Sequence, residues 1–242
     1  MSETAPLRAA ITGLLGFAAA EDEVLLTRAS GGAEETGNER QWAAVPTVAH
    51  NTEFKAQQAQ RLTAVLAGRT PAAFADIEHT SGAVYAAYAA IPAAAVAADA
   101  RRVTAALLDG LRAVTDADLV DPARHRWLNG RPLWLQIIVR GFWHPTGHVA
   151  DYYLRHGQPG QAVALQEHAV ATARYVQAPR HALGMAVYSL ACAQAQAALT
   201  DDASRSLAQA IELNPDVRAN AGRDPDLTPL REAGQLAEIL AR

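Results

Sequence analysis

Apolar side chains recur every three or four residues along much of this 242-residue chain, and this spacing predicts helices. The rhythm is clearest after Pro92, where it runs through Val96, Val103, Leu107, Leu108 and Leu111. Alanine, the best helix former, supplies much of the apolar half of the composition, whereas β-branched residues are sparse. We therefore expect an all-α fold.

Breaks in this rhythm divide the chain into expected helices. Glycines and polar residues interrupt it over 30–40, Gly68 is placed as a helix-ending glycine, and 115–132 reads as a loop with a turn at Asn129-Gly130. The expected long helices cover 5–29, 43–66, 92–114 and 132–157, with a weaker piece over 72–90. Shorter helices are expected over 159–175, 181–199 and 202–213. We predict a four-helix bundle over residues 1–157 and a smaller helical domain over residues 158–242.

Composition excludes several classes of protein. The formal net charge is −4, so the chain lacks the basic footprint of a nucleic-acid-binding protein. No apolar run reaches the length of about eighteen residues that a membrane span needs, and the acidic N-terminal stretch favours an amphipathic helix over a signal peptide. The single cysteine, Cys192, excludes an internal disulfide framework. We expect a cytoplasmic protein with neither nucleic-acid nor membrane partners.

The segment GFWHPTGHVADYY carries a histidine pair, His144 and His148, that is one helical turn apart. Two imidazoles at this spacing can share a metal ion, although chance also produces such pairs. Pro145 lies between them and would clash with the carbonyl group of Gly141, so we expect the helix to kink or to restart there. The alternative is two histidines that are hydrogen-bonded at a kinked end of the bundle.

A third histidine, His50, follows Trp42 by eight residues in WAAVPTVAHNTEF. With Trp42, His50, His144 and His148 at these places, residues 5–157 resemble the DinB-like four-helix bundle superfamily, which includes the YfiT-like and the mycothiol-dependent maleylpyruvate isomerase-type proteins. In that superfamily three histidines from the second and last helices hold a divalent metal. The resemblance implies a metal site made of His50, His144 and His148, with zinc as the first expectation and nickel as the second.

Three neutral histidines leave a zinc position open, which is typical of a catalytic site. We consider Glu53 as a base, with Asp151 and Tyr152 as further catalytic groups, although each also reads as a solvated or capping residue. The resemblance implies a metal-dependent enzyme that acts on a small electrophilic or thiol-conjugated metabolite by thiol transfer, isomerisation or hydrolysis. Such chemistry serves detoxification or natural-product metabolism. The alternative is a non-catalytic small-ligand-binding or self-resistance protein.

Arginine makes up all but one of the 21 basic residues, the exception being Lys55. This bias, together with the abundant alanine, is typical of GC-rich genomes such as those of actinomycetes. Mycothiol or another low-molecular-weight thiol is therefore a candidate co-substrate.

The last part of the chain resembles the terminal unit of a tetratricopeptide-repeat array. The residues that carry the likeness are Tyr188, Leu190, Ala191, Cys192, Ala195, Leu207, Ala210, Ile211, Leu213-Asn214-Pro215, Asp224-Pro225-Asp226-Leu227 and Leu230. An isolated unit cannot build the groove that several stacked repeats form. The resemblance therefore implies a structural cap, a homodimerisation element or a docking element for a partner.

Overall fold

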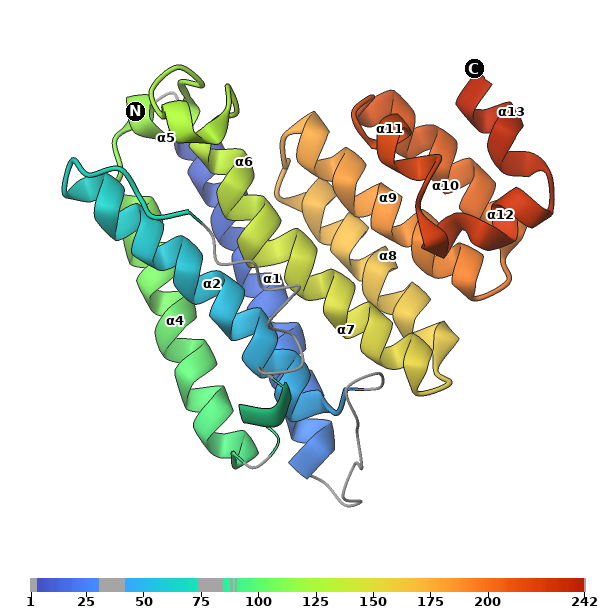
Figure 1. Cartoon of the computed structure of the whole chain (residues 1–242), viewed down its shortest axis with the longest axis horizontal. Helices are drawn as coiled ribbons and strands as arrows, with labels where there is room; N and C mark the ends of the chain where they lie inside the picture. The colour runs from blue at the N-terminus through green and yellow to red at the C-terminus, as the bar shows by residue number, and fades with distance from the viewer. Residues whose placement is uncertain (1–3, 31–41, 74–84, 88, 90, 242) are drawn as a thin grey trace. The chain divides into compact units, whose positions relative to one another are not determined.

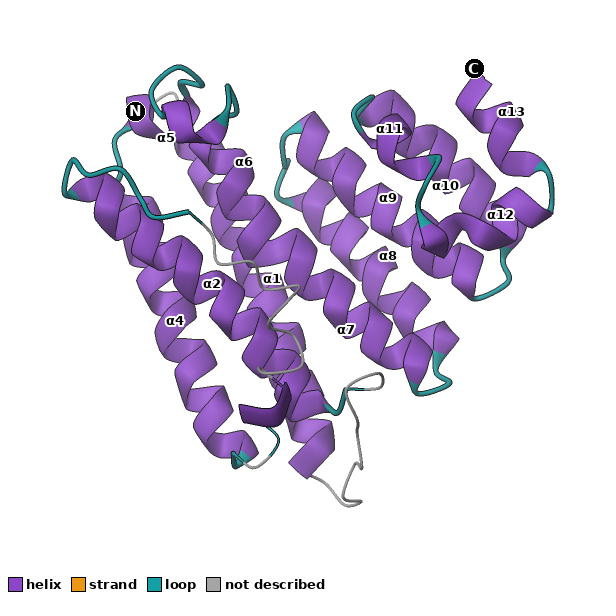
Figure 2. Ribbon diagram, in the orientation of Figure 1, coloured by secondary structure: helices purple, strands orange, loops and turns teal. Residues whose placement is uncertain are grey.

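The computed structural model describes residues 4–30, 42–73, 85–87, 89 and 91–241. Over these residues every regular element is a helix and no strand occurs, so the all-α expectation is confirmed (Figure 2). No helix within the described ranges is both long and apolar enough to cross a membrane. The predicted weak helix over 72–90 lies mostly outside the described residues.

The chain divides into two compact units, Met1–Tyr152 and Tyr153–Arg242. The division falls within a helix, α7 (His144–Arg155), whereas the sequence placed the boundary after that helix, at residue 157. What kind of domain each unit is stays a prediction.

The described residues of unit 1 include three long helices and one composite helix, which are labelled in Figure 1. The long helices are α1 (Ala5–Ser30), α2 (Ala44–Leu66) and α4 (Ala93–Ala113). The composite helix consists of α6 (Leu133–Ile138), the π-helical turn η3 (Val139–Trp143) and α7. α1, α2 and α4 pack against one another, and η3 packs against both α1 and α2.

The core of unit 1 follows the spacing of three and four that predicts its helices. Its fully buried members include Ile11, Leu14, Leu15 and Leu25 on α1, Leu62 on α2, Leu107 and Leu111 on α4, and Ile137 on α6. Gly110 allows the close approach of α4 to α2, because a Cβ atom there would lie 2.8 Å from Leu62.

The segment 115–132 corrects the sequence analysis, which expected a loop. It contains α5 (Asp116–Val120) and a 3₁₀ turn, η2 (Arg126–Leu128). Thr115 caps α5, because its hydroxyl oxygen accepts a hydrogen bond from the backbone amide of Asp118 at 3.1 Å. The expected turn at Asn129-Gly130 is present, and both residues have a positive φ.

Unit 2 contains α8 (Pro159–Tyr175), α9 (Arg180–Gln196) and α10 (Thr200–Leu213), with α9 packed against both of the others. Four short helices follow: α11 (Val217–Ala221), η4 (Pro225–Leu227), α12 (Thr228–Glu232) and α13 (Gln235–Ala241). Gly184 near the start of α9 approaches Asn214 just after α10, so α9 and α10 run antiparallel.

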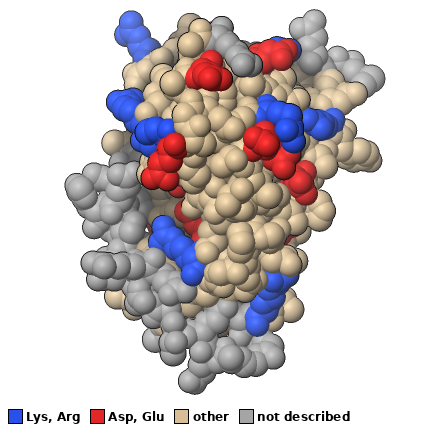
Figure 3. Space-filling model, turned by 90° about the vertical axis from the view of Figure 1, so that its right-hand side faces the viewer, with Lys and Arg blue, Asp and Glu red and all other residues tan. Residues whose placement is uncertain are grey.

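Figure 3 shows acidic and basic side chains interspersed on the face that it draws.

Candidate metal centre

The structure brings together the three histidines that the sequence singled out. His50 lies on α2, and His144 and His148 lie on α7. The Nε2 atom of His148 is 3.2 Å from Nε2 of His50 and 3.0 Å from Nε2 of His144. His50 is only 3% exposed, whereas the other two side chains are half-buried. Nitrogen atoms from two separate helices therefore converge on one point.

These separations fit ligands that share a metal ion. Zinc–nitrogen bonds of about 2.0–2.1 Å place two ligands of a tetrahedral site about 3.3 Å apart. Hydrogen bonding explains the cluster less well, because Nε2 of His148 faces two other ring nitrogens at once. A neutral ring nitrogen carries either one proton or one lone pair, so it can make only one well-aligned hydrogen bond of this kind. The cluster could hold a metal ion.

A π-helical turn delivers the two histidines of α7. Pro145 cannot donate a hydrogen bond to the carbonyl group of Gly141, and the expected distortion takes the form of η3, which ends directly before His144. The Thr146 hydroxyl group donates to the carbonyl oxygens of Phe142 and Trp143 at 2.9 and 3.1 Å. This side chain therefore satisfies carbonyl groups at the point where the helical hydrogen bonding changes.

Aromatic rings surround the imidazoles. Trp42 meets His50 edge to face, with ring centroids 5.2 Å apart, and Phe54 stacks on His144 with centroids 3.7 Å apart. Phe54 also lies 4.8 Å from the ring of His50. These contacts hold two of the three rings in orientations that direct their Nε2 atoms at His148.

Burial keeps His50 and His144 neutral near pH 7. It lowers the pKa of His50 from its ordinary value of 6.5 to about 4. Burial also lowers the pKa of His144 to about 2, with smaller contributions from its electrostatic interactions with His148, His50 and Arg140. A neutral imidazole is the form that binds a metal, so near pH 7 these lone pairs are available without the loss of a proton.

A buried polar network ties the cluster to α1, and the sequence analysis did not predict it. The Lys55 ammonium group donates to Asp22 at 2.6 Å, and both side chains are only 1% exposed. The side-chain amide nitrogen of Asn51, Nδ2, donates to the Asp22 carboxylate at 2.8 Å and to the carbonyl oxygen of Pro145 at 3.3 Å. Because Asn51 follows His50 and Pro145 follows His144, this network links the backbones that carry two of the histidines.

The three side chains predicted to be catalytic lie outside the histidine cluster. Glu53 is half-buried on α2 and accepts a 3.4 Å hydrogen bond from Gln57. Asp151 is half-buried, and Tyr152 is buried on α7. Neither carboxylate supplies an atom to the group of converging ligand atoms. The catalytic roles of Glu53, Asp151 and Tyr152 stay predictions.

A second cluster of ligand-type atoms, formed by Cys192, Asp224 and Asp226, lies in unit 2. Its geometry is that of a helix cap, since Asp224 accepts from the backbone amide of Asp226 at 3.0 Å at the start of η4. The Tyr188 hydroxyl group donates to Asp224 at 2.5 Å. Burial, followed by the proximity of Cys192 and Asp224, raises the pKa of Tyr188. We interpret this cluster as a hydrogen-bonded connection between α9 and η4.

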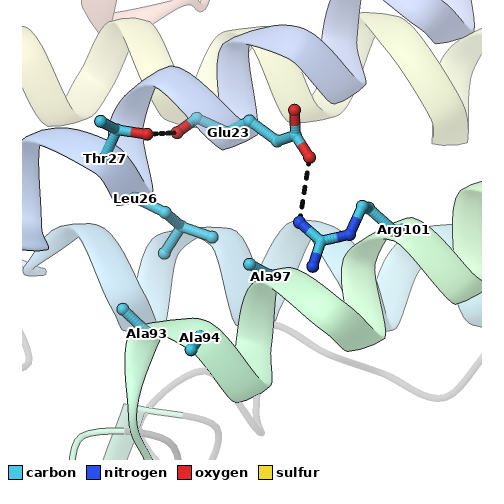
Figure 4. A pocket seen from close by; sticks show the side chains of 7 residues that line it. All are labelled: Glu23, Leu26, Thr27, Ala93, Ala94, Ala97 and Arg101. Carbon is cyan, nitrogen blue, oxygen red and sulfur yellow. Dashed lines mark hydrogen bonds and ion pairs between the residues drawn. The ribbon is translucent and has the colours of Figure 1, made fainter.

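A surface hollow of about 320 Å³ lies between α1 and α4 (Figure 4). Alanine side chains of α4 form much of its wall, and Glu23 and Arg101 make a 3.1 Å ion pair across it. Both partners of that pair are largely exposed, and none of the three histidines lines the hollow. The hollow is therefore not part of the candidate metal centre.

Comparisons of the chain with protein-family models, curated proteins and solved structures found no match. The candidate metal centre is therefore defined by the residues of this chain alone.

Proposed function

We propose that unit 1 is a DinB-like bundle and that the protein is a metal-dependent enzyme. Its substrate would be a small electrophilic or thiol-conjugated metabolite. The reaction would be thiol transfer, isomerisation or hydrolysis, and it would serve detoxification or natural-product metabolism. The observation that carries this proposal is the convergence of three Nε2 atoms. Nε2 of His148 lies 3.2 Å from Nε2 of His50 and 3.0 Å from Nε2 of His144. Zinc is the first candidate and nickel the second.

The arrangement of the histidines favours catalysis over a purely structural metal. Three protein ligands leave at least one coordination position open, whereas structural zinc sites are closed by four. His144 and His148 are only half-buried, which favours access for a small molecule. When bound, the metal would act as a Lewis acid that lowers the pKa of a water or thiol group entering its open position. Mycothiol or a similar thiol is the candidate co-substrate.

We propose that unit 2 is a tetratricopeptide-like element that caps the chain, forms a homodimer or docks a partner. Support comes from the antiparallel pairing of α9 and α10, where Gly184 approaches Asn214. Small buried side chains on α9, including Ala191 and Ala195, suit such close packing.

Metal analysis tests the first half of the enzyme proposal. We expect about one equivalent of zinc or nickel in protein that is purified without a histidine tag, as one three-histidine site requires. A double variant, His50→Ala with His148→Ala, should lose the metal. The matched control is His168→Ala, because His168 is exposed on α8 in unit 2. Protein that binds no zinc or nickel after reconstitution would contradict the proposal.

Activity measurements test the second half. Thiol conjugates and strained electrophiles would be screened with metal-loaded protein, and any turnover should disappear with a chelator and return with zinc. His148→Ala should lose activity while its circular dichroism spectrum is unchanged. A variant that binds no metal yet turns over substrate at the wild-type rate would show that the histidines are not catalytic. Metal binding without any turnover would favour the non-catalytic ligand-binding alternative.

A further inference from the structure

Asn51 on α2 connects the metal centre to two other helices of unit 1. It follows His50 directly in the chain, and it is 0% exposed. Its Nδ2 atom donates to Oδ1 of Asp22 on α1 at 2.8 Å and to the carbonyl oxygen of Pro145 on α7 at 3.3 Å. One buried amide nitrogen on α2 therefore binds oxygen atoms of both α1 and α7.

Lys55 fixes the position of Asp22 against α2. It lies four residues after Asn51, so the two side chains leave α2 on the same face. The Lys55 ammonium group donates to Oδ2 of Asp22 at 2.6 Å, whereas Asn51 donates to Oδ1. Both oxygens of this buried carboxylate are thus held by α2, and its charge is balanced. Asn51 is therefore anchored on α1 while it reaches α7.

The two contacts of Nδ2 require the amide of asparagine. An amide nitrogen carries two N–H groups, so it can donate to two oxygen atoms at once. An ionised aspartate has the same shape, but it only accepts hydrogen bonds and would face the carboxylate of Asp22. Leucine has a similar size and no donor. Substitution of Asn51 by leucine therefore removes the link between α1 and α7 with little change in volume.

The bond to Pro145 lies directly beside two of the metal ligands. His50 is the residue before Asn51, and His144 is the residue before Pro145. The bond therefore joins the backbones of two helices at the positions that carry their histidines. Groups of a metal site must be held within about 0.5 Å of their working positions. A change in the separation of α2 and α7 would move His50 away from the histidine pair on α7.

His50 lacks the contact that usually orients a metal-binding histidine. The ring nitrogen that does not bind the metal normally donates to a carboxylate, a carbonyl oxygen or water. In His50 this atom is Nδ1, which is buried and has no hydrogen-bond partner within the part of the chain that the structure describes. The rings of Trp42 and Phe54 contact His50 from just before α2 and from α2 itself, so these contacts do not fix His50 relative to α7. The bond from Asn51 to Pro145 does.

We propose that Asn51 is a positioning residue of the metal centre. It holds α7 at the separation from α2 at which His50, His144 and His148 bind one ion, and Asp22 holds Asn51 in place. Asn51 acts through the two backbones, so its effect falls on metal affinity and coordination geometry. The inference rests on the proposed metal centre and adds to it a residue outside the three ligands.

Zinc affinity and the spectrum of bound cobalt(II) test this role in the full chain. Zinc dissociation constants would be measured by competition with a chromophoric chelator, and the visible absorption of cobalt(II) would report the coordination geometry. Asn51→Leu should weaken zinc binding by about tenfold to a hundredfold, as the loss of an outer contact of a metal site does, and it should change the cobalt absorption bands. Asn51→Ala, which adds no atoms to a packed site, should do the same.

Leu111→Ala separates positioning from a general loss of stability. Leu111 is 1% exposed in the core of unit 1 on α4, so this variant should lower the urea midpoint without touching the network. We expect it to keep the zinc affinity and the cobalt spectrum of the wild type. Asn51 variants that are folded by circular dichroism, bind zinc as tightly as the wild type and show its cobalt spectrum would overturn the proposal.

Failure of the metal centre itself gives a different result. The wild type would then bind neither zinc nor cobalt(II), which would overturn the metal centre and the role of Asn51 together. Equal binding by the wild type and the Asn51 variants would overturn the role of Asn51 alone.

Discussion

At the scale of single residues, Lys55 and Asp22 form an ion pair in which both side chains are only 1% exposed. Removing one member of a buried ion pair leaves an uncompensated charge, so Lys55→Met should lower the free energy of unfolding by about 3–5 kcal/mol. Replacing both, with Lys55→Met and Asp22→Leu, should restore much of that loss. Urea denaturation of the single and double variants measures the coupling, and strictly additive losses would contradict it.

Protonation of the histidines is the second residue-scale prediction. An ordinary histidine binds a proton near pH 6.5, but His50 does so only near pH 4 in the folded chain. Between these values the unfolded chain binds more protons, so the free energy of unfolding of metal-depleted protein should fall as the pH falls. His50 alone contributes a loss of about 3 kcal/mol by pH 4.

Urea denaturation at a series of pH values checks this slope. The carboxylates of the chain also contribute to it, so the informative comparison is with His50→Gln, which should show a shallower slope between pH 6.5 and 4. His168→Ala, a substitution at an exposed position of α8, serves as the control for replacing a histidine. Equal slopes for wild type and His50→Gln would show that burial does not suppress the protonation of His50.

At the scale of elements, close approach at Gly141 holds η3 against the bundle. A Cβ atom there would overlap the side chain of Leu15 and come within 3.1 Å of Leu107. Gly141→Ala should therefore lower the free energy of unfolding by about 1–3 kcal/mol through overpacking. Gly16→Ala on α1 is the matched control, since no atom lies within 4 Å and a gain of about 0.5–1 kcal/mol is expected. Thermal unfolding would distinguish them, and a gain at both positions would contradict the packing interpretation.

The helices themselves were largely predictable, and the contacts between them were not. The apolar spacing gave α2, α4 and α8 to within a residue or two, because each is long enough to repeat the pattern several times. The short helix α5 was missed, because Asp116–Val120 is too brief to show a period, although its Thr115 cap was a readable signal.

The same contrast holds for the candidate site. His50, His144 and His148 were predicted through their spacing and a family resemblance, and the structure brings them together. The pairing of Lys55 with Asp22 depends on how α1 and α2 are aligned, which no spacing within either helix reveals. Within the described residues, neither amide atom of the buried Gln58 side chain has a hydrogen-bond partner, and no spacing in the sequence reveals this, because it depends on the surrounding elements.

At the scale of the whole molecule, the two units carry separate reporters. All four tryptophans, Trp42, Trp127, Trp134 and Trp143, lie in unit 1, and the only cysteine, Cys192, lies buried in unit 2. Tryptophan fluorescence therefore reports the unfolding of unit 1, and thiol labelling of Cys192 reports the opening of unit 2.

Zinc binding should stabilise one unit and not the other. A ligand that binds only the folded state at one hundred times its dissociation constant adds about 2.7 kcal/mol. With zinc in that excess, the urea midpoint from fluorescence should rise, whereas the midpoint from pulse labelling of Cys192 should stay where it is in chelator. In His148→Ala the fluorescence midpoint should no longer respond to zinc. If both midpoints rose together in the wild type, the units would unfold as one, and the metal would stabilise the whole chain instead of the bundle that binds it.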